Sequence, residues 1–144
     1  MIIDATNMIL GRLASKAAKQ ALLGENIIVV NCEKAVVTGS GKQILENYIQ
    51  KSSVGQVNQG PYFPKRPEML VRRTIRGMLP KKPKGRSAFE RVTCHIGMPS
   101  TLKPEDAKTV PEADINRIKK AAHMTIGELC RHIGYKESVM VKRQ

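Results

Sequence analysis

The sequence predicts an α/β fold, a three-layer α/β/α arrangement with a largely parallel sheet of about four strands and extended basic loops. Residues 27–30 form a continuous apolar run, Ile-Ile-Val-Val, which is typical of a strand buried on both faces in a parallel sheet. A helical pattern over 11–23 separates this run from a first apolar segment, giving the order strand, helix, strand. Hydrophobic residues make up 41% of the 144 residues, enough for one domain with a real core.

The first half of the chain supplies most of this fold. Residues 1–4 form a short strand, and Thr6 or Asn7 can cap the helix over 11–23. That helix has a buried face of Leu and Ala, opposite a basic stripe of Arg12, Lys16 and Lys19. The strand over 26–31 is followed by a strand over 35–38 and a helix over 43–50. Gly, Ser, Asn, Gln and Pro dominate residues 51–64, which indicates a loop.

The most unusual stretch lies between Lys65 and Arg91. It contains ten Lys or Arg and two Glu, a net charge of +8 out of +13 for the chain. Pro67 suits the first position of a helix, and Pro80 ends that helix. Val71, Thr74, Ile75 and Met78 fall on one side of it. The opposite side carries Arg72, Arg73 and Arg76.

This arginine face favours a phosphate backbone as the partner, because a planar guanidinium can bind a phosphate with two hydrogen bonds. The alternative is an ordinary solvated helix face. A cationic loop then carries Lys81, Lys82, Lys84 and Arg86, with two prolines that stiffen it. A mobile, solvated loop is its alternative. Tyr62 and Phe63 can anchor the preceding loop on the body, or lie against a ribose.

The later part of the chain is less regular. A strand over 92–96 is expected to be the last of the sheet, and three prolines mark an irregular connector after it. Thr125 and Glu128 have the spacing of a capping box, which begins a helix with Ile126, Leu129, Cys130 and Ile133 on one face. We expect a single domain over 1–144, with a compact body over about 1–98 and a connector and C-terminal helix over about 99–144. The basic residues 139–143 are either a frayed end or an RNA contact.

Several motifs of this chain resemble the large-subunit ribosomal protein L13 family. They are Asp4-Ala5-Thr6, Gly11-Arg12-Leu13-Ala14, Asn31-Cys32-Glu33-Lys34-Ala35-Val36-Val37-Thr38-Gly39, Arg66-Pro67-Glu68, Ile75-Arg76-Gly77-Met78-Leu79-Pro80, Gly85-Arg86 and Phe89. The spacer after the first helix and the tail beyond residue 100 look like the archaeal/eukaryotic-type branch. In place of Cys94-His95 that family more often has an aliphatic and then an aromatic residue.

The resemblance implies a structural constituent of the large ribosomal subunit that binds 23S-type ribosomal RNA and supports subunit assembly and translation. It implies a cytoplasmic location, neighbouring large-subunit ribosomal proteins as further partners, and neither a cofactor nor a small-molecule substrate. The candidate rRNA-binding residues are Arg12, Lys42, Lys65, Arg66, Arg72, Arg73, Arg76, Lys81, Lys82, Lys84 and Arg86. With so few aromatic residues, 3% of the chain, RNA shape is expected to matter more than base identity.

Two other function classes fit the sequence less well. Residues 39–42, Gly-Ser-Gly-Lys, look like the end of a phosphate-binding loop, but Val36 stands where that motif needs its first glycine. An enzyme that binds a nucleotide there is therefore disfavoured, and the three histidines and three cysteines have no catalytic or zinc-ligand spacing. A DNA-binding protein is disfavoured because no recognition helix or paired half-site dimer is evident. No apolar run is long enough to span a membrane.

Overall fold

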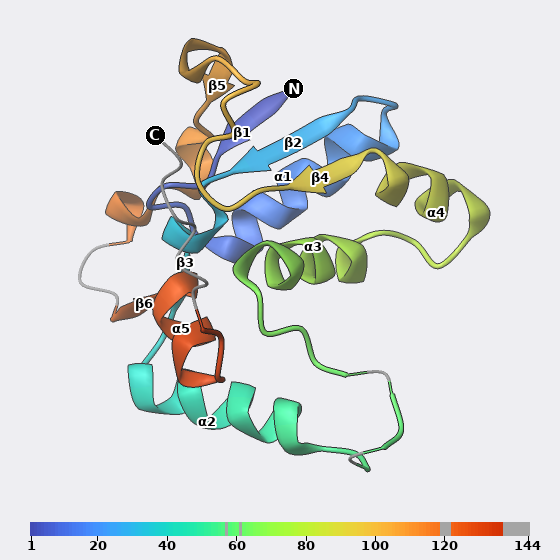
Figure 1. Cartoon of the computed structure of the whole chain (residues 1–144). Coiled ribbons are helices and arrows are strands. Elements are labelled where there is room, and N and C mark those ends of the chain that lie inside the picture. The colour runs from blue at the N-terminus through green and yellow to red at the C-terminus, as the bar shows by residue number, and fades with distance from the viewer. Residues whose placement is uncertain (57, 61, 119–121, 137–144) are drawn as a thin grey trace.

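A four-stranded sheet forms the centre of the computed structural model, which describes residues 1–56, 58–60, 62–118 and 122–136 (Figure 1). Its order is β4-β2-β1-β5, and every pair of neighbours is parallel. The strands are β1 (Ile2–Asp4), β2 (Ile27–Val30), β4 (Val92–Cys94) and β5 (Ala107–Lys108). With five α-helices and a parallel sheet in the part of the chain that the structure describes, the predicted α/β class is confirmed, and the arrangement is consistent with a three-layer α/β fold.

Helix α1 (Leu10–Leu22) joins β1 to β2, as the sequence predicts. Its alanines and Leu13 are buried, which lets the helix backbone approach its neighbours closely. The predicted side-chain cap is wrong, because Ile9 is the N-cap residue and forms no side-chain hydrogen bond to the helix. Asn7 instead takes a left-handed conformation with φ of 57°, so it turns the chain before the helix begins.

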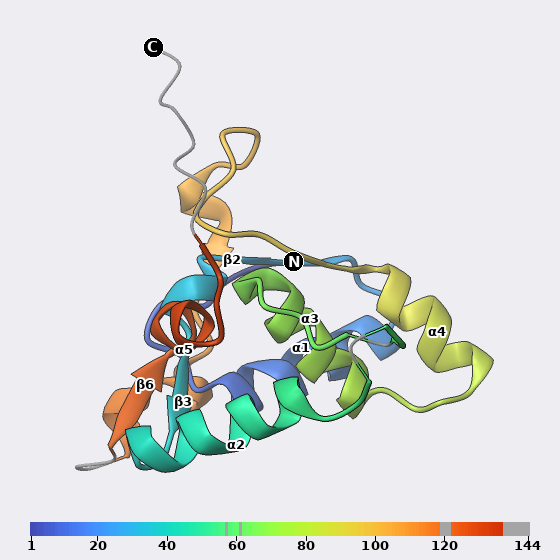
Figure 2. The same ribbon diagram turned by 60° about the horizontal axis from the view of Figure 1, so that its bottom comes forward.

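Helices α1 and α3 (Pro67–Met78) lie next to the sheet, and α2 (Gly41–Ser53) lies on the same side but further from it (Figure 2). Strand residues alternate accordingly: Ile27 and Val29 are fully buried, whereas Ile28 between them is only partly buried. Thr93, paired with Ile28, is exposed. The expectation that β2 is buried on both faces therefore fails at Ile28.

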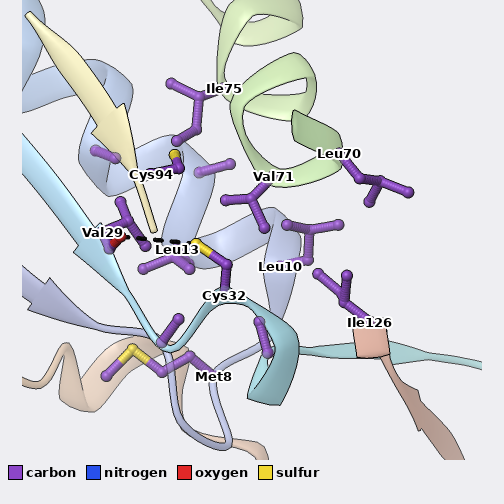
Figure 3. Close-up of a cluster of buried hydrophobic side chains, with 14 of the residues drawn as sticks. Met8, Leu10, Leu13, Val29, Cys32, Leu70, Val71, Ile75, Cys94 and Ile126 are labelled. Atoms are coloured by element: carbon purple, nitrogen blue, oxygen red, sulfur yellow. Dashed lines mark hydrogen bonds between the residues drawn. The ribbon is translucent and has the colours of Figure 1, made fainter. Parts of the chain in front are cut away.

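One cluster of apolar side chains connects the sheet with its helices (Figure 3). Leu10 and Leu13 come from α1, and Leu70, Val71 and Ile75 come from α3. The cysteines Cys32, Cys94 and Cys130 are buried free thiols and pack as small hydrophobic residues. Met78, placed on the apolar side of α3 by periodicity, is instead 41% exposed.

Two short strands form a separate antiparallel pair. Strand β3 (Val36–Thr38) pairs with β6 (His123–Thr125), which is 85 or more residues away in the sequence. The strand predicted over 35–38 thus exists but does not join the main sheet, where β5 takes the fourth place. The strand expected over 92–96 ends at Cys94 and is not the last of the sheet.

The segments after β4 contain mostly short turns of 3-10 helix. These are η2 (Pro104–Asp106), η3 (Pro111–Ala113) and η4 (Ile115–Arg117), and another, η1 (Cys32–Lys34), follows β2. Helix α5 (Ile126–His132) packs on η1 and α3 and adds Ile126, Leu129 and Cys130 to the buried cluster. The basic residues 139–143 lie outside the described residues.

The predicted capping box of α5 is confirmed. The Thr125 hydroxyl accepts a hydrogen bond from the Glu128 backbone N–H, and the Glu128 carboxylate accepts one from the Thr125 N–H, both at 3.2 Å. We expect Thr125→Ala to lower the free energy of unfolding by about 1 kcal/mol, because a helix N–H loses its acceptor. Chemical denaturation measures this, with Thr101→Ala in an exposed turn as the control. Equal stability of the two variants would contradict the assignment.

Candidate nucleic-acid interface

Helix α3 presents arginines on one side because its other side is buried. Pro67 occupies the first helical turn, where its missing N–H is not needed. Leu70, Val71 and Ile75 then pack into the core, at 2% exposure or less. Arg73 and Arg76, which fall on the opposite side of the helical wheel, are exposed. The predicted division of α3 into an apolar and an arginine side is therefore present.

The third arginine of this helix is placed differently. Arg72 is only partly exposed, and its guanidinium carbon lies 4.6 Å from the centre of the Phe89 ring. The guanidinium of Arg76 lies 5.9 Å from the same ring. Within the described part of the chain, the buried Nε of Arg72 has no hydrogen-bond acceptor. Arg72 is thus held by an aromatic face.

Phe63 holds Arg73 in a similar way. The Arg73 guanidinium lies 4.8 Å from the Phe63 ring, and that ring meets Tyr48 of α2 edge to face at 6.0 Å. Lys51 lies 5.2 Å from the Tyr48 ring on its own helix. Phe63 therefore anchors the loop between α2 and α3, the first of the two alternatives for it. Tyr62 beside it is 68% exposed.

The cationic loop of the sequence prediction is partly a helix. Lys81 and Lys82 lie in the turn after α3, but α4 (Pro83–Glu90) begins one residue before Lys84 and therefore includes both Lys84 and Arg86. Pro83 occupies the first helical turn of α4, where no N–H is needed. Lys84 and Arg86 are therefore exposed positions on a helix, and the expectation of a loop over 81–86 is wrong beyond Lys82.

Glu68 forms an ion pair with Arg66, one of the predicted site residues. Its carboxylate lies 2.6 Å from the Arg66 Nε, and the Arg66 side chain is still 65% exposed while that of Glu68 is 11% exposed. Although Glu68 is four residues before Arg72, the structure pairs it with Arg66. Arg66 therefore offers a partly neutralised charge. The neighbouring Lys65 is exposed as well.

Two further candidates lie on other elements. Arg12 of α1 donates a hydrogen bond from Nη1 to the Glu112 carbonyl at 3.1 Å, which connects α1 with η3. Lys42 is exposed in the first turn of α2. In both views that end of α2 lies across the molecule from α4 (Figures 1 and 2). The structure thus brings together the cations of α3, the following turn and α4, but leaves Lys42 apart from them.

Asp4 lies at the carboxyl end of β1, a position where α/β enzymes often keep a functional carboxylate. Its Oδ1 accepts hydrogen bonds from the Thr6 N–H at 3.0 Å, the Thr6 hydroxyl at 2.7 Å and the Asn31 amide at 2.9 Å. Burial opposes its ionisation, but the bonds from Asn31 and Thr6 outweigh burial and lower the pKa of Asp4. The carboxylate therefore stabilises the turn after β1.

A pH dependence follows from this lowered pKa. Stability that depends on the Asp4 charge is fully present above the pKa that Asp4 has in the unfolded chain, about 4. This stability is lost as the pH falls through the pKa of Asp4 in the folded protein. We expect Asp4→Asn to unfold more easily than the wild type at pH 7, and the difference to shrink as the pH falls below about 4. Denaturation at several pH values measures it. A difference that does not depend on pH would contradict the role of the charge.

Other kinds of site find little support in the described residues. No group of three or more His, Cys, Asp or Glu there can hold a metal ion. A cavity of about 310 Å³ lies beside Thr6, Lys34, Thr125 and Tyr135, but Gly-Ser-Gly-Lys at 39–42 does not line it. None of the described helices is long and apolar enough to span a membrane.

Sequence reasoning missed Phe89 as a site residue. It appeared only in a family motif, because nothing local links residue 89 to residues 72 and 76. A signal was available in the composition: the chain has only two Phe, of which Phe63 lies just before the basic stretch over 65–91 and Phe89 lies within it.

The comparisons with known proteins agree with the resemblance read from the motifs. The family model described as Ribosomal protein L13 matches residues 1–101. A protein of Methanopyrus kandleri named large ribosomal subunit protein uL13 is 45% identical, over 93% of this chain and 86% of its own length. Proteins with that name from Methanosarcina barkeri and Haloarcula marismortui are 44% and 43% identical, over 94% and 93% of this chain and 98% and 90% of theirs. The chain belongs to the ribosomal protein L13 family.

Proposed function

We propose that this chain is a structural constituent of the large ribosomal subunit, acts in translation and is not an enzyme. Its family membership and the name of its relatives, large ribosomal subunit protein uL13, support this. A ribosomal protein of this subunit has ribosomal RNA and other ribosomal proteins as partners, and its place is in the cytoplasm with the ribosome. Neither a cofactor nor a small-molecule substrate is part of this proposal.

The RNA-binding surface that we propose centres on α3 and α4. The observation that carries it is the exposure of Arg73 and Arg76 on a helix whose other side is fixed in the core. Rigid placement lets guanidiniums meet phosphates without first losing the freedom of a mobile segment. The full proposed set is Arg12, Lys42, Lys65, Arg66, Arg72, Arg73, Arg76, Lys81, Lys82, Lys84 and Arg86.

Binding to this surface is electrostatic and depends on RNA shape. Each phosphate that a Lys or Arg neutralises releases counterions, so the affinity falls steeply with salt. Contacts to the backbone also hold together RNA segments that would otherwise repel each other, which is how the chain would support subunit assembly. We further propose that the whole chain acts as one ribosomal-protein domain, because α5 shares the buried cluster of the sheet and α3.

Equilibrium competition tests this function. The full chain is bound to a folded fragment of large-subunit rRNA over a range of salt concentrations, and either the unlabelled fragment or duplex DNA of equal phosphate content competes. We expect the rRNA fragment to compete at much lower concentration than the DNA. Equal competition by the two nucleic acids would leave only non-specific binding to polyanions and contradict the proposal.

A further inference from the structure

Both phenylalanines of this chain lie against arginines of one helix. Phe63 faces Arg73, and Phe89 faces Arg72 and Arg76, with ring-to-guanidinium distances of 4.8, 4.6 and 5.9 Å. All three guanidiniums of α3 are therefore placed over aromatic rings. Phe89 contacts two of them, and it does so from a different helix, α4.

The ring has two physical effects on these arginines. Its face attracts a cation, and its bulk restricts the rotamers of the long side chains that lie across it. For Arg72 the ring replaces a polar partner, since the buried Nε has no acceptor among the residues described. Arg76 lies further from the ring centre and is exposed, so it stays available to an RNA phosphate while its range of positions is reduced.

Phe89 also joins two groups of cations. It lies near the end of α4, the helix that carries Lys84 and Arg86 at its beginning, and its ring lies against α3. Phe89 is partly exposed and packs against the edge of the buried cluster. The contact therefore fixes the arginines of α3 relative to the cations of α4, and hence the spacing of charges that an RNA fold would meet.

We infer that Phe89 is a positioning residue of the proposed RNA-binding surface, whose ring holds the guanidiniums of Arg72 and Arg76 in place for folded rRNA. This inference rests on the proposed function. Phe89 touches no RNA itself and acts through the arginines. If Phe89 has this positioning role, shape-selective binding needs the aromatic ring at position 89, and an apolar side chain of similar size is not enough.

Two variants of the full chain separate the ring from its apolar bulk. Phe89→Leu keeps an apolar side chain but removes the aromatic face, and Phe89→Tyr keeps the face. We expect Phe89→Leu to weaken binding to the rRNA fragment about three- to tenfold, the range that one or two cation–π contacts supply. Phe89→Tyr should bind within about twofold of the wild type. Binding to duplex DNA, which requires no fixed spacing, should change little in either variant.

A second measurement shows whether the arginines themselves move. In ¹⁵N spectra, the side-chain N–H signals of Arg72 and Arg76 should be shifted by the ring current of Phe89, and Phe89→Leu should remove that shift. The guanidinium of Arg73 lies over Phe63 and not over Phe89. Its signal should therefore stay in place in this variant, which shows that the fold is intact.

The outcomes distinguish this inference from the proposed function. If the wild type does not prefer rRNA to duplex DNA, the proposed function fails. If the wild type prefers rRNA and Phe89→Leu, with an unchanged Arg73 signal, binds rRNA as tightly as Phe89→Tyr does, then the positioning role of Phe89 is wrong. If both variants are weakened equally, the ring face is not the cause, and the inference is also wrong.

Discussion

Replacing Arg73 and Arg76 together with Ala should weaken binding to folded rRNA about 100-fold, while the chain stays folded. Each lost phosphate contact costs about a factor of ten if it contributes about 1.4 kcal/mol. The slope of log affinity against log salt should become shallower by about 1.4–1.8, since each phosphate contact contributes about 0.7–0.9. Both side chains are exposed, so their removal leaves no buried cavity. Filter binding or fluorescence anisotropy over a salt series measures both quantities.

The matched control removes the same charge elsewhere. Lys103→Ala with Arg117→Ala also lowers the net charge by two, at exposed positions away from α3 and α4. If the affinity depended only on net charge, the two double variants would lose it equally. We expect the control to bind within a few-fold of the wild type, because long-range attraction is screened over about 10 Å at 0.1 M salt. Equal losses in the two variants would contradict a localised site.

Replacing Gly85 with Ala should destabilise the protein by about 1–3 kcal/mol, the cost of overpacking a tight contact. Gly85 is buried in α4, and a Cβ there would overlap the Pro80 carbonyl oxygen, which is backbone and cannot rotate away. Either α4 moves or the turn over 80–82 rearranges. Because that turn carries Lys81 and Lys82, and α4 carries Lys84 and Arg86, RNA affinity should fall with stability.

Gly77→Ala is the control for this steric effect. Gly77 lies in α3, one turn before the same junction, and a Cβ there would meet no atom within 4 Å. Replacing a helical glycine by alanine in open space is expected to stabilise the helix by up to about 1 kcal/mol. Thermal and denaturant unfolding of the two variants should therefore give changes of opposite sign. Gly85→Ala with unchanged stability would mean that the α3–α4 junction is not the tight contact described.

Sequence patterns predicted the elements whose signals are local. Helix α1, helix α3 and the capping box at Thr125 follow from periodicity, proline placement and spacing within one segment. The pairing of β3 with β6 and the entry of β5 into the sheet could not be predicted in this way. They join segments about 85 and 105 residues apart in the chain, and β5 is only two residues long. Such pairings depend on how the whole chain packs.

The same limit applies to the binding surface. The arginine side of α3 was predictable, because burial of Val71 and Ile75 determines which residues face outward. Lys84 and Arg86 were expected in a loop, because the prolines and Gly85 outweighed the helical pattern. Pro83 in fact begins α4, and Gly85 is needed where the helix passes Pro80. The ring contacts of Phe63 and Phe89 join separate elements, so no spacing rule reveals them.

The most direct test of the arginine surface uses the ribosomal particle itself. Large subunits lacking this protein are incubated with the wild type or with the Arg73→Ala/Arg76→Ala variant, washed at increasing salt and sedimented. If α3 binds folded rRNA, the wild-type chain sediments with the subunit through the high-salt wash, and the variant is released at lower salt. Release of both chains at the same salt concentration, or failure of the wild type to sediment with the subunit, would contradict the account.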